Sequence, residues 1–155
     1  MRDVAVISFA QTPMRRRVEE LNEVEMLMPA VHDVLDQVDM TIDDIGFTCS
    51  GSTDYLAGMA FSFVSTLDGV GPWPPIQESH VEMDGAWALY EAWVKLQLGE
   101  IDTALVYAYA KSSPGDLPMV LTRQLDPICV APLWPDSVSM AALQARALLD
   151  AGRAT

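Results

Sequence analysis

The stretch that decides the fold is residues 79–99, which read SHVEMDGAWALYEAWVKLQLG. From Gly85 onward the residues suit a helix that is apolar on nearly all of its surface, and such a helix is normally buried. We therefore expect it to lie in the centre of the fold. His80, Glu82 and Asp84 come just before it, which places titratable groups at a helix N-terminus. These three side chains are candidate catalytic residues, although a core helix with an ordinary Asp84 cap explains the same pattern.

The composition around this stretch is that of a globular chain with an acidic surface. Half of the 155 residues are hydrophobic, and the length allows one domain of ordinary size. The formal net charge of -13 argues against a nucleic-acid partner and against an anionic membrane surface. No apolar run approaches the roughly 18 to 20 residues that span a bilayer. No signal peptide is visible, so we predict a cytoplasmic protein without membrane insertion.

The cysteines and histidines do not form a recognisable metal or redox motif. Cys49 and Cys129 lie far apart in the sequence, so one disulfide is conceivable, but we interpret both as reduced thiols. His80 and Glu82 match the His-x-Glu half of a zinc deaminase, but no Pro-Cys-x-x-Cys motif follows them. No dinucleotide fingerprint or phosphate-binding loop is present. We predict no metal site.

Hydrophobic patterning predicts strands and helices in alternation. The expected strands cover residues 4–10, 46–50, 76–81 and 102–110. The expected helices cover residues 19–38, 57–69, 85–98 and 137–152. Alternation of this kind is the signature of an α/β fold with a mostly parallel sheet and helices on both faces.

Individual segments carry further expectations. Residues 4–10, VAVISFA, are apolar and rich in β-branched side chains, which suits a central strand covered on both faces. Residues 76–81 are more polar and suit an edge strand. Pro29 interrupts the pattern of the first helix, so we expect either a kink or a helix that begins near Pro29. His32, on that helix, is expected at the surface.

The pattern changes after residue 110. Residues 111–135 hold five prolines and few periodic apolar positions, which predicts an irregular excursion from the sheet. An amphipathic helix over residues 137–152 follows. We therefore divide the chain into an α/β core, residues 1–110, and a loop region, residues 111–155.

The order and spacing of four segments resemble a known family. They are residues 4–13 (VAVISFAQTP), 44–55 (DIGFTCSGSTDY), 83–113 (MDGAWALYEAWVKLQLGEIDTALVYAYAKSS) and 136–152. Together they resemble the N-terminal half of the thiolase superfamily, in its branch of nonspecific lipid-transfer proteins and sterol carrier protein X-type thiolases. Members of this branch work in lipid metabolism, including sterol degradation.

The resemblance implies more than this chain contains. The family fold has five layers and two similar halves, with two buried helices between two sheets, so the chain would be a fragment or a half that needs a partner. Family members form dimers through the strand that corresponds to residues 76–81. Lyase relatives also pair with a small zinc-ribbon and OB-type protein. Coenzyme A thioesters would be substrates, and the cations available for their phosphates are Lys111, Arg123 and Arg15 to Arg17.

The most informative departure from the family lies at the start of the central helix. Family thiolases place a nucleophilic cysteine there, and alignment on Gly85 puts Glu82 at that position. An acyl-thioenzyme is therefore not expected, whereas lyase relatives cleave aldol-type acyl-CoA adducts without that cysteine. Three interpretations stay open: a thiolase-like enzyme acting on acyl-CoA, by acyl transfer or carbon–carbon cleavage; a non-catalytic thiolase-like scaffold; and an unrelated α/β protein.

Overall fold

A computed structural model describes residues 1–57, 61–111 and 116–154. The chain forms two compact units, Met1–Pro114 and Gly115–Thr155, and each is described by itself. The sequence-based division lies at residue 110. The first unit holds the sheet and the candidate site.

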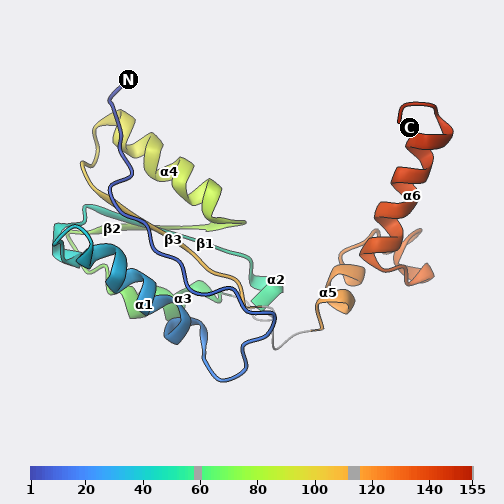
Figure 1. Ribbon diagram of the computed structural model, residues 1–155, viewed down its shortest axis with the longest axis horizontal. Coiled ribbons are helices and arrows are strands. Elements are labelled where there is room, and N and C mark those ends of the chain that lie inside the picture. Colours follow the sequence, from blue (N-terminus) through green and yellow to red (C-terminus); the bar gives the residue numbers. More distant parts are fainter. Residues whose placement is uncertain (58–60, 112–115, 155) are drawn as a thin grey trace. The chain divides into compact units, whose positions relative to one another are not determined.

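A three-stranded parallel sheet forms the centre of the first unit. Its strands are β1 (Phe47–Ser52), β2 (Gln77–Glu82) and β3 (Ala104–Ala108), in the spatial order β2-β1-β3 (Figure 1). Every residue of β1 is buried, because β1 lies between the other two strands. The predicted α/β class with a parallel sheet is confirmed, and so is the position of β2 at an edge.

Helices cover both faces of the sheet, as predicted. Helix α4 (Gly85–Leu98) packs against one face, and α1 (Glu23–Asp36) and α3 (Phe63–Val70) lie on the other (Figure 1). Alternate residues of β1 serve the two faces, since successive side chains of a strand point in opposite directions. The core under α4 consists of Phe47, Cys49, Ala88, Ala92 and Ile101. The core under α1 and α3 consists of Leu27, Val31, Ile45, Val70, Leu105 and Tyr107.

Helix α1 begins before Pro29, although a start near Pro29 was one of the two expected possibilities. Asn22 caps it, because its side chain accepts from the amide of Glu25 while the Glu25 carboxylate accepts from the amide of Asn22. The helix therefore starts before Pro29 and contains it, and the expected start near Pro29 is wrong. The capping box offsets part of the cost of an interior proline.

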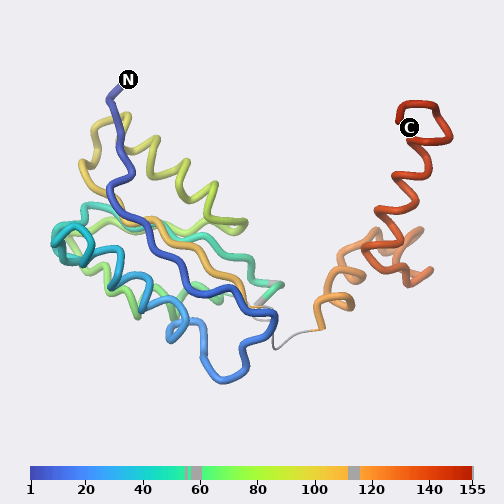
Figure 2. The backbone as a smooth tube through the Cα atoms, viewed as in Figure 1, coloured from blue at the N-terminus to red at the C-terminus, as the bar shows by residue number. Residues whose placement is uncertain are grey.

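The expected central strand at residues 4–10 is not formed. This segment is extended but pairs with no strand, and most of its side chains are exposed; Figure 2 shows its uncoiled course. The physical reason is that β1 pairs directly with β3, which leaves no central position to fill. Hydrogen bonds hold the segment near its two ends, from Arg2 to the backbone of Leu96 and Ile101 and between Phe9 and the Gln37 side chain.

Helix α4 has the expected bounds but is not buried all round. Asp84 caps its start and Gly99, in the left-handed conformation, ends it. Only its sheet-facing side is covered in this chain. The opposite side is apolar and exposed, and its exposed residues include Trp87, Leu89, Tyr90, Trp93 and Leu98. The expectation of a fully buried helix is therefore wrong for this chain.

The remaining elements of the described residues are two short helices in the first unit and the helices of the second unit. In the first unit they are η1 (Ile42–Asp44) and α2 (Asp54–Ala57). In the second unit they are α5 (Leu117–Arg123), η2 (Ala131–Leu133) and α6 (Ser137–Asp150). The excursion expected to be irregular thus contains helices, because Asp116 caps α5 and Pro118 occupies its first turn, where proline is tolerated. No helix in the described part of the chain combines the length and apolar character that crossing a bilayer requires.

The close approach of β1 to the start of α4 depends on a glycine. A Cβ atom built on Gly51 would lie 2.5 Å from the carbonyl oxygen of Asp84. The backbone that carries Asp84 and the first turn of α4 can therefore sit directly against β1 only because Gly51 has no side chain. This contact fixes the position of the first turn of α4 relative to the carboxyl end of β1.

We predict that Gly51→Ala destabilises the fold by about 1–3 kcal/mol, because backbone atoms must move apart to admit the methyl group. Gly46→Ala is the matched control, since its Cβ would make an ordinary contact at 3.4 Å with the carbonyl oxygen of Thr103. Urea unfolding followed by circular dichroism measures both. Equal losses of stability in the two variants would contradict this view of the contact.

Candidate functional site

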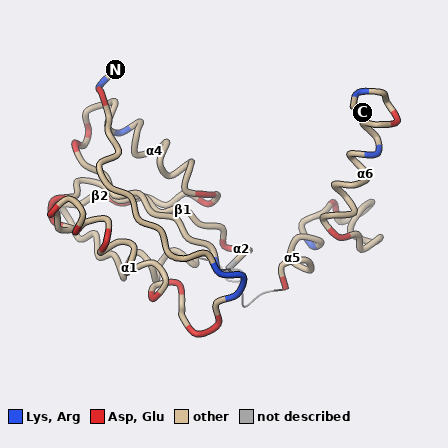
Figure 3. Tube along the Cα trace, viewed as in Figure 1, with Lys and Arg blue, Asp and Glu red and all other residues tan. Residues whose placement is uncertain are grey.

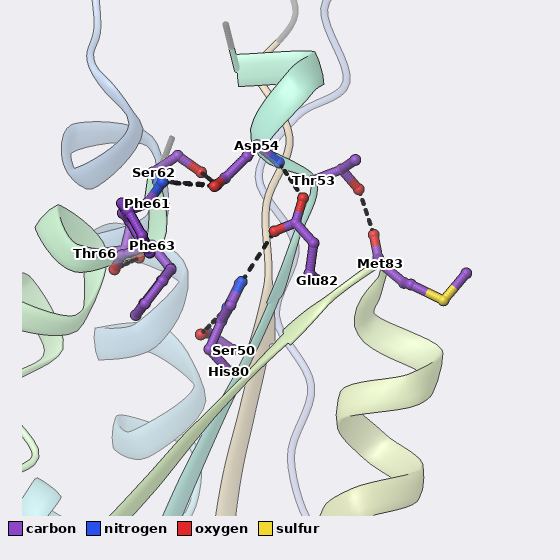
Figure 4. Close-up of polar contacts among 10 residues, drawn as sticks. All are labelled: Ser50, Thr53, Asp54, Phe61, Ser62, Phe63, Thr66, His80, Glu82 and Met83. Carbon is purple, nitrogen blue, oxygen red and sulfur yellow. Dashed lines mark hydrogen bonds and ion pairs between the residues drawn. The ribbon is translucent and has the colours of Figure 1, made fainter. Parts of the chain in front are cut away.

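The carboxyl ends of β1 and β2 bring polar side chains together. The register pairs Ser50 with His80 and Ser52 with Glu82. Because the strands are parallel, their ends meet at one edge of the sheet, which is where α/β proteins place ligand sites. The Ser50 Oγ lies 2.9 Å from Nδ1 of His80. Figure 4 shows this group of residues around the strand ends.

His80 and Glu82 form the titratable centre of the group. Nε2 of His80 lies 3.4 Å from Oε2 of Glu82, and Oε1 of Glu82 accepts a hydrogen bond of 2.7 Å from the backbone amide of Asp54. The His80 side chain is 12% exposed and the Glu82 side chain 49% exposed. The ring of Phe63 stacks on the imidazole at 4.1 Å between centroids. An imidazole edge and a carboxylate therefore lie side by side, with the carboxylate open to solvent.

Asp54 connects the end of β1 to the start of α3. Its carboxylate accepts from the amides of Phe61 and Ser62 and from the Ser62 hydroxyl, at 2.5, 2.9 and 2.8 Å. Burial by itself would raise the pKa of Asp54, but the hydrogen bonds from Ser62 and Phe61 and the charge of His80 outweigh it, and the pKa lies below its usual range. Asp54 thereby holds the start of α3, and with it Phe63, against the site.

Asp84 has a different task from the other two predicted site residues. Its Oδ1 accepts from the amides of Ala86 and Trp87 at 2.9 and 3.2 Å, which is ordinary N-capping. The structure brings His80 and Glu82 together and leaves Asp84 engaged with the first turn of α4. Met83 lies between Glu82 and Asp84 in the sequence. Its carbonyl accepts from the Thr53 hydroxyl at 2.6 Å, which links the ends of β1 and β2.

Two residues of the site, Ser50 and Phe63, were not predicted from the sequence, which assigns them to a strand and a helix without any role in a site. Asp54 ends a run of small polar residues, 51–54, that follows the predicted strand, and such a run is typical of a ligand site on an α/β sheet and equally of an ordinary loop. The available signal was positional, since Ser50 stands two residues before the end of the buried strand β1 and Asp54 two residues beyond that end. Only the strand register shows which residue of the neighbouring strand each one meets.

Cys49 does not lie at this edge. Cys49 belongs to the opposite face of β1, and its thiol contacts the Glu91 carboxylate at 3.8 Å. Burial raises the pKa of Cys49 to about 12, and the negative charge of Glu91 adds to the rise. This thiol stays protonated at neutral pH and is a poor nucleophile. Cys129 is an exposed, free thiol in the second unit.

The basic residues expected to bind phosphate belong to different parts of the chain. Lys111 is buried beyond the end of β3 and donates to the carbonyl of Leu21. Arg15 and Arg17 form ion pairs with Glu20 and Glu19. The basic run that they share with Arg16 precedes α1 (Figure 3), whereas Arg123 lies in the second unit. Within the described residues, no three His, Cys, Asp or Glu side chains gather in a way that could hold a metal ion.

Comparison with known proteins does not assign the chain. None of the protein-family models matches it, and no curated protein matches it at a significant level. Its function is therefore argued from the residues and their geometry.

We predict that acid weakens the Asp54 clamp in a defined direction. A carboxylate whose pKa is lowered in the folded state stabilises that state above its unfolded pKa, and the stabilisation disappears as the pH falls through the folded pKa. Asp54→Asn should therefore destabilise the protein at pH 7, and the difference from the unmodified protein should shrink towards pH 3. Urea unfolding at both pH values measures it, and a difference that does not change with pH would contradict the prediction.

Proposed function

We propose that this chain is an α/β half of a thiolase-like protein that cleaves a carbon–carbon bond in an acyl-CoA thioester. The observation that supports the proposal most directly is the pairing of His80 with Glu82 at the carboxyl edge of a parallel sheet. This edge also adjoins the N-terminus of α4, which is the helix that the family resemblance makes central. An imidazole and a carboxylate in contact are a suitable pair for proton transfer.

The cysteines favour cleavage without a covalent acyl group. Thiolysis needs a thiolate at the start of the central helix, and Glu82 occupies that region in this chain. The Cys49 thiol faces the other side of the sheet and is held protonated. A retro-aldol reaction needs only proton transfer and stabilisation of an enolate, so it suits the residues that are present.

The proposed reaction balances without a cofactor. Glu82 removes the proton from the β-hydroxyl group of the substrate, and the electron pair on that oxygen forms the carbonyl of the leaving ketone or aldehyde. The bond between Cα and Cβ breaks, and its electrons form the enolate of the thioester. A proton then returns to Cα, and His80 beside Glu82 is placed to share in its transfer. Net, one proton moves from oxygen to carbon.

The uncovered side of α4 supports the proposal of a larger thiolase-like assembly. Trp87, Tyr90 and Trp93 form a contiguous aromatic row, with ring centroids 6.0 Å apart in each step. In the family, the central helices of two similar halves pack against each other, and such packing would cover this row. Exposed apolar surface of this kind usually marks an interaction site. The open edge of β2 is compatible with the homodimer that the resemblance also implies.

The same aromatic row favours the second candidate function, a non-catalytic scaffold. In that case α4 binds the thiolase-like half that carries the chemistry, and His80 and Glu82 only stabilise the strand ends. A small zinc-ribbon and OB-type protein is a further proposed partner. For the enzyme, phosphate groups of coenzyme A would meet the basic run at Arg15 to Arg17.

We predict that Glu82→Gln in the full-length protein lowers kcat for cleavage of a β-hydroxyacyl-CoA by about 10²–10⁴-fold, the usual contribution of one acid–base group. His80→Gln should act in the same direction. The KM for the thioester should change little, since neither residue is proposed to bind coenzyme A. Release of the ketone or aldehyde, followed by carbonyl derivatisation and mass spectrometry, measures the rate.

Cys129→Ser is the matched control, because its exposed thiol has no role in the proposed reaction and its loss should leave the rate unchanged. Full activity in both Glu82→Gln and His80→Gln would remove this edge from the mechanism. A stable complex with an active partner, combined with no turnover by the unmodified protein, would favour the scaffold instead.

A further inference from the structure

A row of hydroxyl groups continues from His80 into the interior of the sheet. On the face of β1 under α1 and α3, every second residue carries a hydroxyl: Thr48, Ser50 and Ser52. The register sets Ser50 between His80 of β2 and Tyr107 of β3. Residues in register on neighbouring strands point to the same face, so these three side chains are neighbours across the sheet.

The hydroxyl row is costly for stability. Among the described residues, the buried hydroxyls of Thr48, Ser52, Tyr107 and Tyr109 make no hydrogen bond that satisfies normal geometry. An unpaired buried hydroxyl lowers stability, and valine at position 48, alanine at position 52 or phenylalanine in place of the tyrosines would avoid that cost. Burial raises the pKa of Tyr107 to about 12. Packing therefore does not explain why this face is polar.

The hydrogen bonds determine which nitrogen of neutral His80 carries the proton. An ionised carboxylate only accepts hydrogen bonds, and Oε1 of Glu82 accepts one from the amide of Asp54. The nitrogen that faces its other oxygen, Nε2, must therefore be the donor. Nδ1 is then the acceptor, and it receives the hydroxyl proton of Ser50 at 2.9 Å.

Phe63 fixes the plane of the imidazole ring but does not choose between its two flipped orientations. Its ring is nearly parallel to the imidazole, with 11° between the planes. Stacking of this kind is almost the same for either orientation, so the edge-on hydrogen bonds must decide. Ser50 is the group that distinguishes Nδ1 from Nε2 on the buried side.

We propose that Ser50 is a positioning residue whose hydroxyl holds neutral His80 in the tautomer that is protonated at Nε2, facing Glu82. The contact of serine, histidine and carboxylate is not a nucleophilic triad, because Ser50 is only 1% exposed and no substrate reaches it. The proposal rests on the proposed function for the reaction that the positioned His80 serves. The hydrogen-bond geometry itself does not depend on that reaction.

Nitrogen-15 NMR of the imidazole rings in the full-length protein tests the proposal. The signals lost in His32→Gln and in His80→Gln assign the two rings of this chain, and His32 serves as an internal reference. At a pH where both rings are neutral, His80 should be protonated at Nε2 and unprotonated at Nδ1. Ser50→Ala should shift the tautomer ratio towards Nδ1 by about five- to tenfold, which corresponds to the loss of one ordinary hydrogen bond.

Tyr109→Phe is the matched control, because it removes a buried hydroxyl directly after the end of β3 without touching Ser50. It should leave the His80 signals unchanged, and Ser50→Thr, which keeps a hydroxyl, should restore the Nε2 tautomer. Protonation at Nδ1 in the unmodified protein, or no response to Ser50→Ala in a folded variant, overturns the proposal. The predicted spectra without any cleavage of acyl-CoA would instead refute the proposed function and leave the positioning role of Ser50 standing.

Discussion

The parallel pairing of β1 with both of its neighbours is the constraint on which the structure of the first unit depends. It aligns the carboxyl ends of the strands at one edge and so brings Ser50, His80 and Glu82 together from two strands. It also gives the two faces of β1 different tasks. One face packs Phe47 and Cys49 under α4, and the other carries the hydroxyl row under α1 and α3. A shift of one residue in this register would exchange the two faces and dismantle the site.

The sequence predicted the kinds of elements better than their environments. Alternating apolar and helical patterns were sufficient for β1, β2 and α4, because their signals are local: a buried β-branched or small-residue run, an Asp84 cap and a final Gly99. Residues 4–10 have an equally strong strand signal, yet they form no strand of the sheet. The central position that they were expected to fill is absent because β1 pairs directly with β3, and no local pattern encodes that pairing. The exposure of α4 likewise depends on what covers its second side.

The candidate site was predicted only in part, because some of its contacts are local in sequence and others join distant segments. His80 and Glu82 stand two residues apart on one strand, so their common direction follows from the strand period alone. Ser50 and Asp54 reach them from β1 and its following loop, and Phe63 from α3, across 17 to 32 residues of sequence. Asp84 shows the opposite case, because a carboxylate beside two candidates serves as a helix cap. The clustering of charged residues in the sequence therefore indicated the region of the site. The hydrogen bonds in the structure distinguish the His80 and Glu82 pair from the helix cap at Asp84.

The central proposal is that proton transfer at the His80 and Glu82 edge cleaves a carbon–carbon bond, with no covalent acyl group. The most direct test is cleavage of a β-hydroxyacyl-CoA by the full-length protein in deuterium oxide, with mass spectrometry of both products. The proposal predicts a ketone or aldehyde together with a shortened acyl-CoA that carries one deuterium at Cα, since the enolate takes its proton from groups that exchange with solvent. Release of free coenzyme A with transfer of the acyl group, or no carbonyl product at all, would contradict it.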